Sequence, residues 1–266
     1  MTQDLPPPDP AATSLDRFLD GRLVVAQPAK GHHRAGLDAI LLAATVPEAA
    51  EGLLVDLGAG VGTAGLAVAL RAPRLAVRLA ERDAKALRLA EANIERNHLA
   101  GRVETVAVDL LGPAKAREAV LRRESATHVI CNPPYFAPRA VRASPSARAG
   151  AHVLAEGGLD AWLRVAAATL VPHGRLSLIF EGGGLGEILG ALAGRFGAAA
   201  IRPVHPRAEA PAHRLIVTAT KGSRARPLVL PGLVLHPAGS NAYLAEADSV
   251  LRGRAGLGCG DLTPVP

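Results

Sequence analysis

The sequence has few cysteines and no apolar leader. Of its two cysteines, Cys131 lies inside an apolar run and Cys259 lies near the C-terminus. They are too few and too differently placed for a disulfide framework, and neither has the spacing of metal ligands. The first residues, MTQDLPPPDPAATS, lack the basic region and apolar run of a signal peptide. We therefore expect a cytoplasmic protein without a metal site.

The chain also has few long uncharged stretches. The run from Leu53 to Leu70 is long enough to cross a membrane, and Asp56 is its only charged residue. Its apolar first half ends in a cluster of glycines, and its second half is rich in alanine and leucine. This pattern favours a buried parallel strand, a tight turn and a packed helix over a membrane span. No membrane association is expected.

Length and composition indicate one globular unit. With 266 residues and 49% hydrophobic content, the chain can bury a full core. We expect a disordered, proline-rich tail over residues 1–20, the main domain over residues 21–236 and a C-terminal extension over residues 237–266. The net charge of +6 fits a nucleic-acid partner. Abundant arginine, alanine, glycine and proline are equally typical of a GC-rich genome, so charge alone favours RNA or DNA only slightly.

Apolar runs alternate with helical segments along most of the chain. Runs resembling strands begin near residues 53, 75, 103, 127 and 175, and amphipathic segments separate them. This β-α-β alternation predicts a mainly parallel sheet with helices on both faces. The late runs 200–206 and 214–221 have no long helix between them, so an antiparallel hairpin at the sheet edge is expected. Ligands of such sheets bind beyond the carboxyl ends of the strands.

Polar residues end four successive apolar runs, and glycines follow the first of them. The residues are Asp56 with Gly58, Gly60 and Gly62, then Glu81, Asp109 and Asn132. One such acid could be a helix cap, as we expect for Asp83, but four favour a shared ligand groove. The glycines allow a sharp turn and close approach of a ligand to the helix start. They also match the dinucleotide fingerprint, so a dehydrogenase or a nucleotide-binding module stays open at this point.

The last of these residues opens the motif Asn132-Pro133-Pro134-Tyr135. Two consecutive prolines end sheet pairing and hold the chain extended. Together with the glycine motif, Glu81 and Asp109, this motif resembles the S-adenosylmethionine-dependent amino-methyltransferases. A closer resemblance, to the bacterial tRNA (adenine-N6)-methyltransferases acting beside the anticodon, runs from residues 27–47 to residues 213–236.

The resemblance implies a Rossmann-like class I methyltransferase fold with a seven-stranded, mainly parallel sheet. It implies S-adenosylmethionine as the cofactor, held at its methionine end by Asp56 and the glycines, at the ribose by Glu81 and at the adenine by Asp109. Arg34 and Asp38 would border the same pocket; a surface pair at helical spacing is an equal alternative. Asn132 and the Pro133 carbonyl would hold the reacting amine, and Tyr135 would stack on the target base.

The implied reaction is methylation of adenosine N6 in RNA, with tRNA near the anticodon as the expected partner. Methylation of a protein glutamine at N5 and of rRNA guanine at N2 are alternatives, since each acceptor is a planar amine. Arginine residues between positions 137 and 158 could contact phosphate or simply face solvent. The oligomeric state is open.

Overall fold

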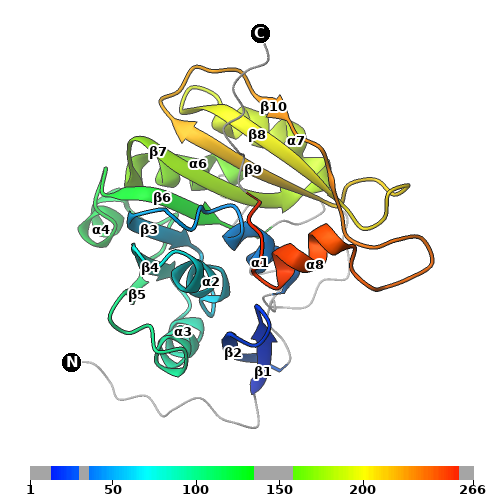
Figure 1. Ribbon diagram of the computed structural model, residues 1–266. Helices are drawn as coiled ribbons and strands as arrows, with labels where there is room; N and C mark the ends of the chain where they lie inside the picture. Colours follow the sequence, from blue (N-terminus) through cyan, green and yellow to red (C-terminus); the bar gives the residue numbers. More distant parts are fainter. Residues whose placement is uncertain (1–12, 30–35, 135–157, 258–266) are drawn as a thin grey trace, which may run out of the picture.

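The structure, a computed structural model, describes residues 13–29, 36–134 and 158–257. Its centre is a large sheet with helices packed on both faces (Figure 1). The elements that build this layer arrangement are α1 (Leu37–Ala43), β3 (Gly52–Leu57), α2 (Thr63–Arg71), β4 (Leu75–Glu81), α3 (Ala84–Arg96), β5 (Val103–Ala107), α4 (Ala114–Val120), β6 (Ala126–Cys131), α6 (Gly158–Thr169), β7 (Leu170–Glu181), α7 (Leu185–Leu192), β8 (Phe196–His205), β9 (Arg214–Lys221), β10 (Leu228–Val229) and β11 (Leu233–Val234).

The order of the strands confirms the expected α/β fold. Within the described residues the sheet has nine strands rather than the seven expected; their order is β10-β8-β9-β7-β6-β3-β4-β5, and β11 also pairs with β8. Strands β3 to β7 run parallel to one another, and β9 lies antiparallel between β7 and β8. The predicted hairpin of β8 and β9 is therefore correct. The prediction that this hairpin forms the sheet edge is wrong, because β10 and β11 extend the sheet beyond β8. These two strands were not predicted, because two residues are too few to show a periodic pattern.

The two faces of the sheet bury two apolar clusters. Along β3, Leu54 belongs to one cluster and Val55 to the other, because successive strand side chains point to opposite faces. Helices α1, α2 and α3 cover the first cluster, whereas α6 and α7 cover the second. Strands that are buried on both faces read as nearly continuous apolar runs, which explains the apolar residues of β3 from Leu53 onward. None of the described helices is long and apolar enough to span a membrane.

A hairpin replaces much of the expected N-terminal tail. Residues Thr13–Phe18 form β1, which pairs antiparallel with β2 (Leu23–Pro28). The prediction of disorder over residues 1–20 is therefore wrong from residue 13 onward, and residues 1–12 lie outside the described part. The sequence pattern did not indicate this hairpin, because the hairpin is stabilised by side chains at the end of α3, which is far away in the sequence.

Asn93, in the last turn of α3, and Asn97, the C-cap of this helix, bond the backbone of β2 as a neighbouring strand would. Asn97 accepts a hydrogen bond from the Val24 amide (2.9 Å) and donates one to the Val24 carbonyl (2.8 Å). One turn earlier, Asn93 makes the same pair of bonds with Ala26, at 2.7 and 3.0 Å. Asn93 also donates to the Val61 carbonyl at 3.0 Å. The fully buried Asn93 thereby connects the N-terminal hairpin to the glycine turn after β3.

Part of the C-terminal extension packs into the main core. Helix α8 (Ala245–Leu251) lies beside α1 in Figure 1, and its Ala247 and Val250 are buried in the first apolar cluster. Further on, the Leu257 amide donates to the Ala44 carbonyl at 2.7 Å. Residues up to 257 are therefore continuous with the α/β fold.

Candidate active site

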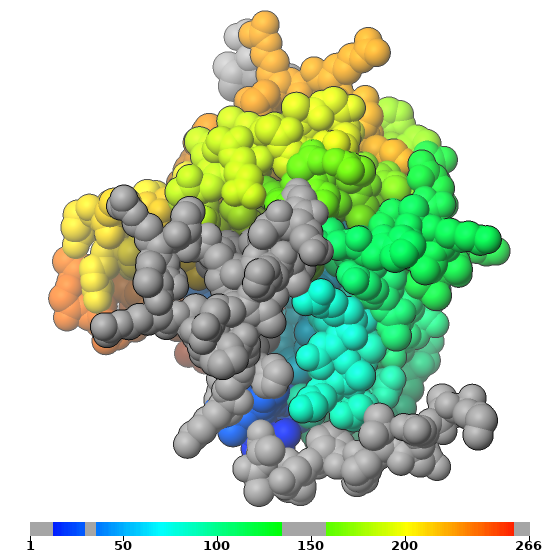
Figure 2. All heavy atoms as spheres, turned by 180° about the vertical axis from the view of Figure 1, so that it is seen from behind, coloured from blue at the N-terminus to red at the C-terminus, as the bar shows by residue number. Residues whose placement is uncertain are grey.

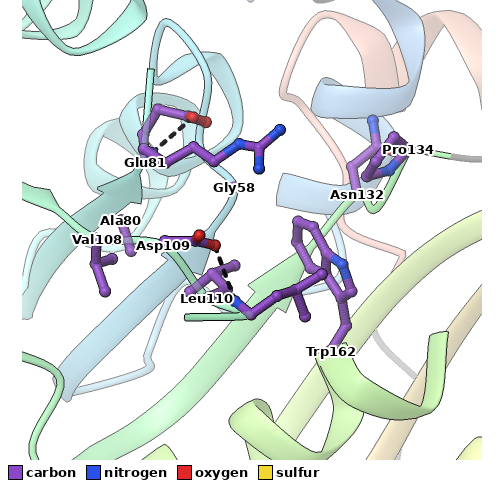
Figure 3. Close-up of a pocket in the computed structure, with 11 residues that line it drawn as sticks. Gly58, Ala80, Glu81, Val108, Asp109, Leu110, Asn132, Pro134 and Trp162 are labelled. Carbon is purple, nitrogen blue, oxygen red and sulfur yellow. Dashed lines mark hydrogen bonds between the residues drawn. The ribbon is translucent and has the colours of Figure 1, made fainter. Parts of the chain in front are cut away.

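The carboxyl ends of the parallel strands β3, β4, β5 and β6 meet at one edge of the sheet. A pocket at this edge contains three of the four polar residues that the sequence singled out. Figure 3 shows Glu81 and Asp109 along one wall, and Asn132, Pro134 and Trp162 along the other. The complete lining is Gly58, Ala80, Glu81, Arg82, Val108, Asp109, Leu110, Leu111, Asn132, Pro134 and Trp162.

The turn after β3 brings the backbone against the ring of Trp162. Gly58 has a φ of +69°, and a Cβ atom at this position would lie 2.5 Å from a ring carbon of Trp162. Only glycine fits both the left-handed backbone and this close approach. The amides of Gly58 and Ala59 donate to the Ala80 carbonyl at 2.8 and 3.0 Å, so the turn is also attached to β4.

Asp56 lies beneath this turn and does not line the pocket. Its Oδ2 atom accepts a hydrogen bond from the Gly65 amide in the first turn of α2, at 2.9 Å. Burial raises the pKa of Asp56 to about 7; the Gly65 bond opposes this rise and the charge of Glu81 adds to it. The carboxyl group is thus placed to orient the start of α2. Gly62 is the N-cap residue of α2.

Glu81 has a carboxylate that three backbone amides orient. Its Oε2 accepts from Gly60 at 2.9 Å, and its Oε1 accepts from Arg82 and Asp83 at 2.7 and 2.9 Å. Each carboxylate oxygen can accept more than one hydrogen bond, so acceptor capacity remains toward the pocket. Asp83 in turn accepts from the amides of Lys85 and Ala86, which confirms it as the N-cap of α3.

Asp109 presents a carboxylate beside apolar walls. Its Oδ1 accepts from the Leu111 amide at 3.0 Å, and no described residue hydrogen-bonds its Oδ2. The neighbouring side chains of Val108 and Leu110 are buried. A flat apolar ring with an amine at its edge would match this combination of surfaces.

Two polar atoms of the opposite wall have no partner among the residues that the structure describes. They are Oδ1 of Asn132 and Nε1 of Trp162, and both are buried. Buried polar atoms are normally hydrogen-bonded, and leaving one unpaired costs about 1–3 kcal/mol. An acceptor and a donor without partners among the described residues therefore belong to two side chains that line the same pocket, where a ligand could supply the missing bonds.

The remaining predicted residues fall elsewhere. Asp38 pairs with Arg214 at the start of β9, with 2.9 Å between Oδ2 and Nε, and does not line the pocket. Arg34, Tyr135 and the arginines between positions 137 and 157 lie outside the described residues. Trp162 is the residue that sequence reasoning missed. As the only tryptophan it was visible, but an apolar helical pattern indicates burial without identifying what the side chain contacts.

Comparison with known proteins gives a consistent classification. The family model described as the methyltransferase small domain matches residues 31–183. A solved structure from Agrobacterium tumefaciens, titled a predicted O-methyltransferase, is 37% identical; the match covers 84% of this chain and 99% of that chain, with a TM-score of 0.72. A 16S rRNA N2 methyltransferase from Thermus thermophilus, solved with AdoMet and guanosine, shares the fold at 22% identity; this match covers 81% of this chain and 52% of that one, with a TM-score of 0.56.

Curated relatives match a shorter region. The tRNA1(Val) (adenine(37)-N6)-methyltransferase of Shewanella halifaxensis is 32% identical over 145 residues, which are 53% of this chain and 55% of the relative. Its namesake from Dickeya chrysanthemi is 33% identical over 147 residues, 55% and 56% of the two chains. The chain thus spans little more than half the length of these two relatives. The expected class I methyltransferase fold is confirmed, and the chain belongs to the methyltransferase small domain family.

Proposed function

We propose that this protein transfers the methyl group of S-adenosylmethionine to N6 of an adenosine in RNA, with tRNA near the anticodon as the substrate. The names of the curated relatives support this choice of reaction and RNA. The proposal assigns the reaction to a domain spanning residues 21–236 and to the cytoplasm, where tRNA is abundant.

The pocket residues fit the proposed cofactor chemically. Glu81 has acceptor capacity for two ribose hydroxyls, and Asp109 beside Val108 and Leu110 suits an adenine ring with its exocyclic amine. The glycine turn, held to β4 through Ala80, offers backbone close to the methionine end. The pocket volume of about 150 Å³ is below the range of roughly 300–1,000 Å³ for complete ligand sites, so this pocket would hold only part of the cofactor.

The observation that carries the proposal is the buried Oδ1 of Asn132, which has no hydrogen-bond partner among the residues that the structure describes. An adenine amine is a weak nucleophile because its lone pair is delocalised into the ring. If Asn132 Oδ1 and the Pro133 carbonyl each accept one amine hydrogen, the nitrogen is held in line for attack and its developing tetrahedral shape is favoured. The cofactor, when bound, supplies an electrophilic methyl group on a sulfonium. The amine becomes acidic as it gains the methyl group and can lose a proton late, so Asn132 needs no ionised neighbour.

The target base has to leave its own stack to reach this site. Tyr135 directly follows the two prolines and lies outside the described residues. In the proposal its ring stacks on the flat face of the base, as aromatic side chains do for unpaired RNA bases.

Other methyl acceptors differ in how many hydrogens they can donate to Asn132 Oδ1 and the Pro133 carbonyl. A protein glutamine amide and guanine N2 each have two amine hydrogens, so both fit a pair of acceptors as adenine N6 does. A hydroxyl, the acceptor of an O-methyltransferase, has one hydrogen and would leave one acceptor unused. A dehydrogenase is disfavoured, because the antiparallel β9 between β7 and β8 departs from the parallel sheet of dinucleotide-binding folds.

The test is transfer of a deuterated methyl group to bulk tRNA from cells that lack the gene. Mass spectrometry of the digested nucleosides should show labelled N6-methyladenosine with the wild-type protein and almost none with Asn132→Ala. Label in N2-methylguanosine or in ribose O-methylated nucleosides would contradict the adenine assignment. S-adenosylhomocysteine binding, measured by calorimetry, tests the cofactor independently of the acceptor.

A further inference from the structure

An exposed aromatic pair lies on the segment after β11. The rings of His236 and Tyr243 are stacked, with centroids 4.8 Å apart and an angle of 24° between their planes. Tyr243 is 44% exposed. One of its faces is therefore covered by His236, while a substantial part of the residue remains accessible.

Hydrogen bonds hold the backbone around these rings in one conformation. Arg207, in the loop between β8 and β9, donates to the carbonyls of Pro237 and Ser240, both at 2.6 Å. His236 Nδ1 lies 3.0 Å from the Ala242 carbonyl. Figure 2 shows the yellow segment after β8 and the orange segment after β11 gathered on one side of the molecule. The ring pair is thus preorganised, which lowers the entropy lost on binding.

The ring pair lies at the same edge of the sheet as Asn132. Strand β11 runs parallel to β8, and β8 runs in the direction of β7 and β6 because β9 is antiparallel to both of its neighbours. The segments that follow β6, β8 and β11 therefore leave the sheet at one edge. Four strand spacings separate β6 from β11, a distance of roughly 20 Å. A folded RNA loop can extend over such a distance while one of its bases occupies the pocket.

Charge near the rings favours RNA as the ligand. Among the described residues, Arg207 forms no ion pair, and its partners are two carbonyls and the side-chain oxygen of Asn241 at 3.1 Å. Its positive charge is therefore not cancelled by a bonded carboxylate. Aromatic rings next to an arginine are the usual surface on which unpaired RNA bases stack.

We propose that the Tyr243–His236 pair is a stacking platform for an unpaired nucleobase of the substrate RNA, separate from the base that reaches Asn132. This inference rests on the proposed RNA substrate. It assigns to the C-terminal segment the selection of RNAs that have an unpaired loop around the target.

The test compares Tyr243→Ala with Tyr243→Phe, and uses Val229→Ala as the control. Val229 lies on β10 and is 74% exposed, so the control removes an even more accessible apolar side chain away from the platform. Loss of base stacking should weaken tRNA binding by about 5- to 150-fold in Tyr243→Ala. Tyr243→Phe and Val229→Ala should bind tRNA as the wild type does, and all variants should bind S-adenosylhomocysteine equally.

Wild-type tRNA affinity in Tyr243→Ala would overturn the platform, as would equal losses in Tyr243→Ala and Tyr243→Phe. Photocrosslinking covers the case in which Tyr243→Ala folds poorly. Wild-type protein should crosslink within residues 235–244 to RNA carrying 4-thiouridine at successive loop positions, and a lack of crosslinks there would refute the proposal. If the wild type methylates no RNA at all, the proposed function itself fails, which is a distinct result.

Discussion

Replacing Asn132 by alanine should separate stability from catalysis. The substitution deletes a buried oxygen that has no partner among the described residues, and an unpaired acceptor costs about 1–3 kcal/mol. Asn132 is only half-buried, so the cavity left behind is small. We expect the free energy of unfolding of the ligand-free protein to stay constant or rise by up to about 2 kcal/mol, raising the melting temperature by up to about 6 °C.

The same substitution should damage methyl transfer. Loss of one preorganised contact in the transition state lowers the rate by roughly 100-fold or more. Single-turnover transfer to tRNA measures this step, and calorimetry with S-adenosylhomocysteine should show cofactor affinity close to wild type.

Asn93→Ala is the matched control, since it deletes the same side chain at a fully hydrogen-bonded site. Asn93 bonds both backbone groups of Ala26 and the carbonyl of Val61, and these groups would be left without partners. We expect a loss of about 2–5 kcal/mol in the free energy of unfolding. If Asn132→Ala is destabilised in the same way, or transfers methyl groups at the wild-type rate, the amine-holding role of Asn132 is refuted.

Three further predictions concern the pocket and the turn after β3. The stability contributed by Asp56 should be fully present below its unfolded pKa of 3.8 and be lost as the pH rises through its folded pKa of about 7. Asp56→Asn should therefore make the free energy of urea unfolding depend less on pH across this window. Wild-type and variant curves that run parallel would contradict the prediction. Asp109→Ala should weaken S-adenosylhomocysteine binding by about 1–3 kcal/mol in calorimetry, whereas unchanged affinity would assign Asp109 a purely structural role. Gly58→Ala should displace Trp162, shift its fluorescence to longer wavelength and reduce cofactor affinity; an unaltered spectrum would show that the turn can absorb the extra Cβ.

Several features of the site could be predicted because they are local. Glycines at the end of an apolar run require a turn, and polar residues at the ends of parallel strands meet at one edge. Glu81, Asp109 and Asn132 were therefore brought together by an argument that needed only strand direction. The pairing of β8 with β9 followed in the same way from the lack of a helix between them.

Asp56 was predicted to contact the ligand for the same local reason, but its depth in the fold is a tertiary property. A residue that ends a strand can point into a pocket or beneath the following turn, and the chain alone does not distinguish these. Its hydrogen bond to Gly65 and its burial place it beneath the turn.

The sequence by itself determined the alternation of strands and helices from β3 to β9, the glycine turn and the polar edge, because each depends on residues close together in the chain. Tertiary structure decided how distant segments meet. Trp162 reaches Gly58, Asn93 holds both β2 and the glycine turn, and Arg207 supports the segment that carries Tyr243. Such contacts depend on side-chain packing between elements that are tens of residues or more apart, and periodicity within one element contains no information about them.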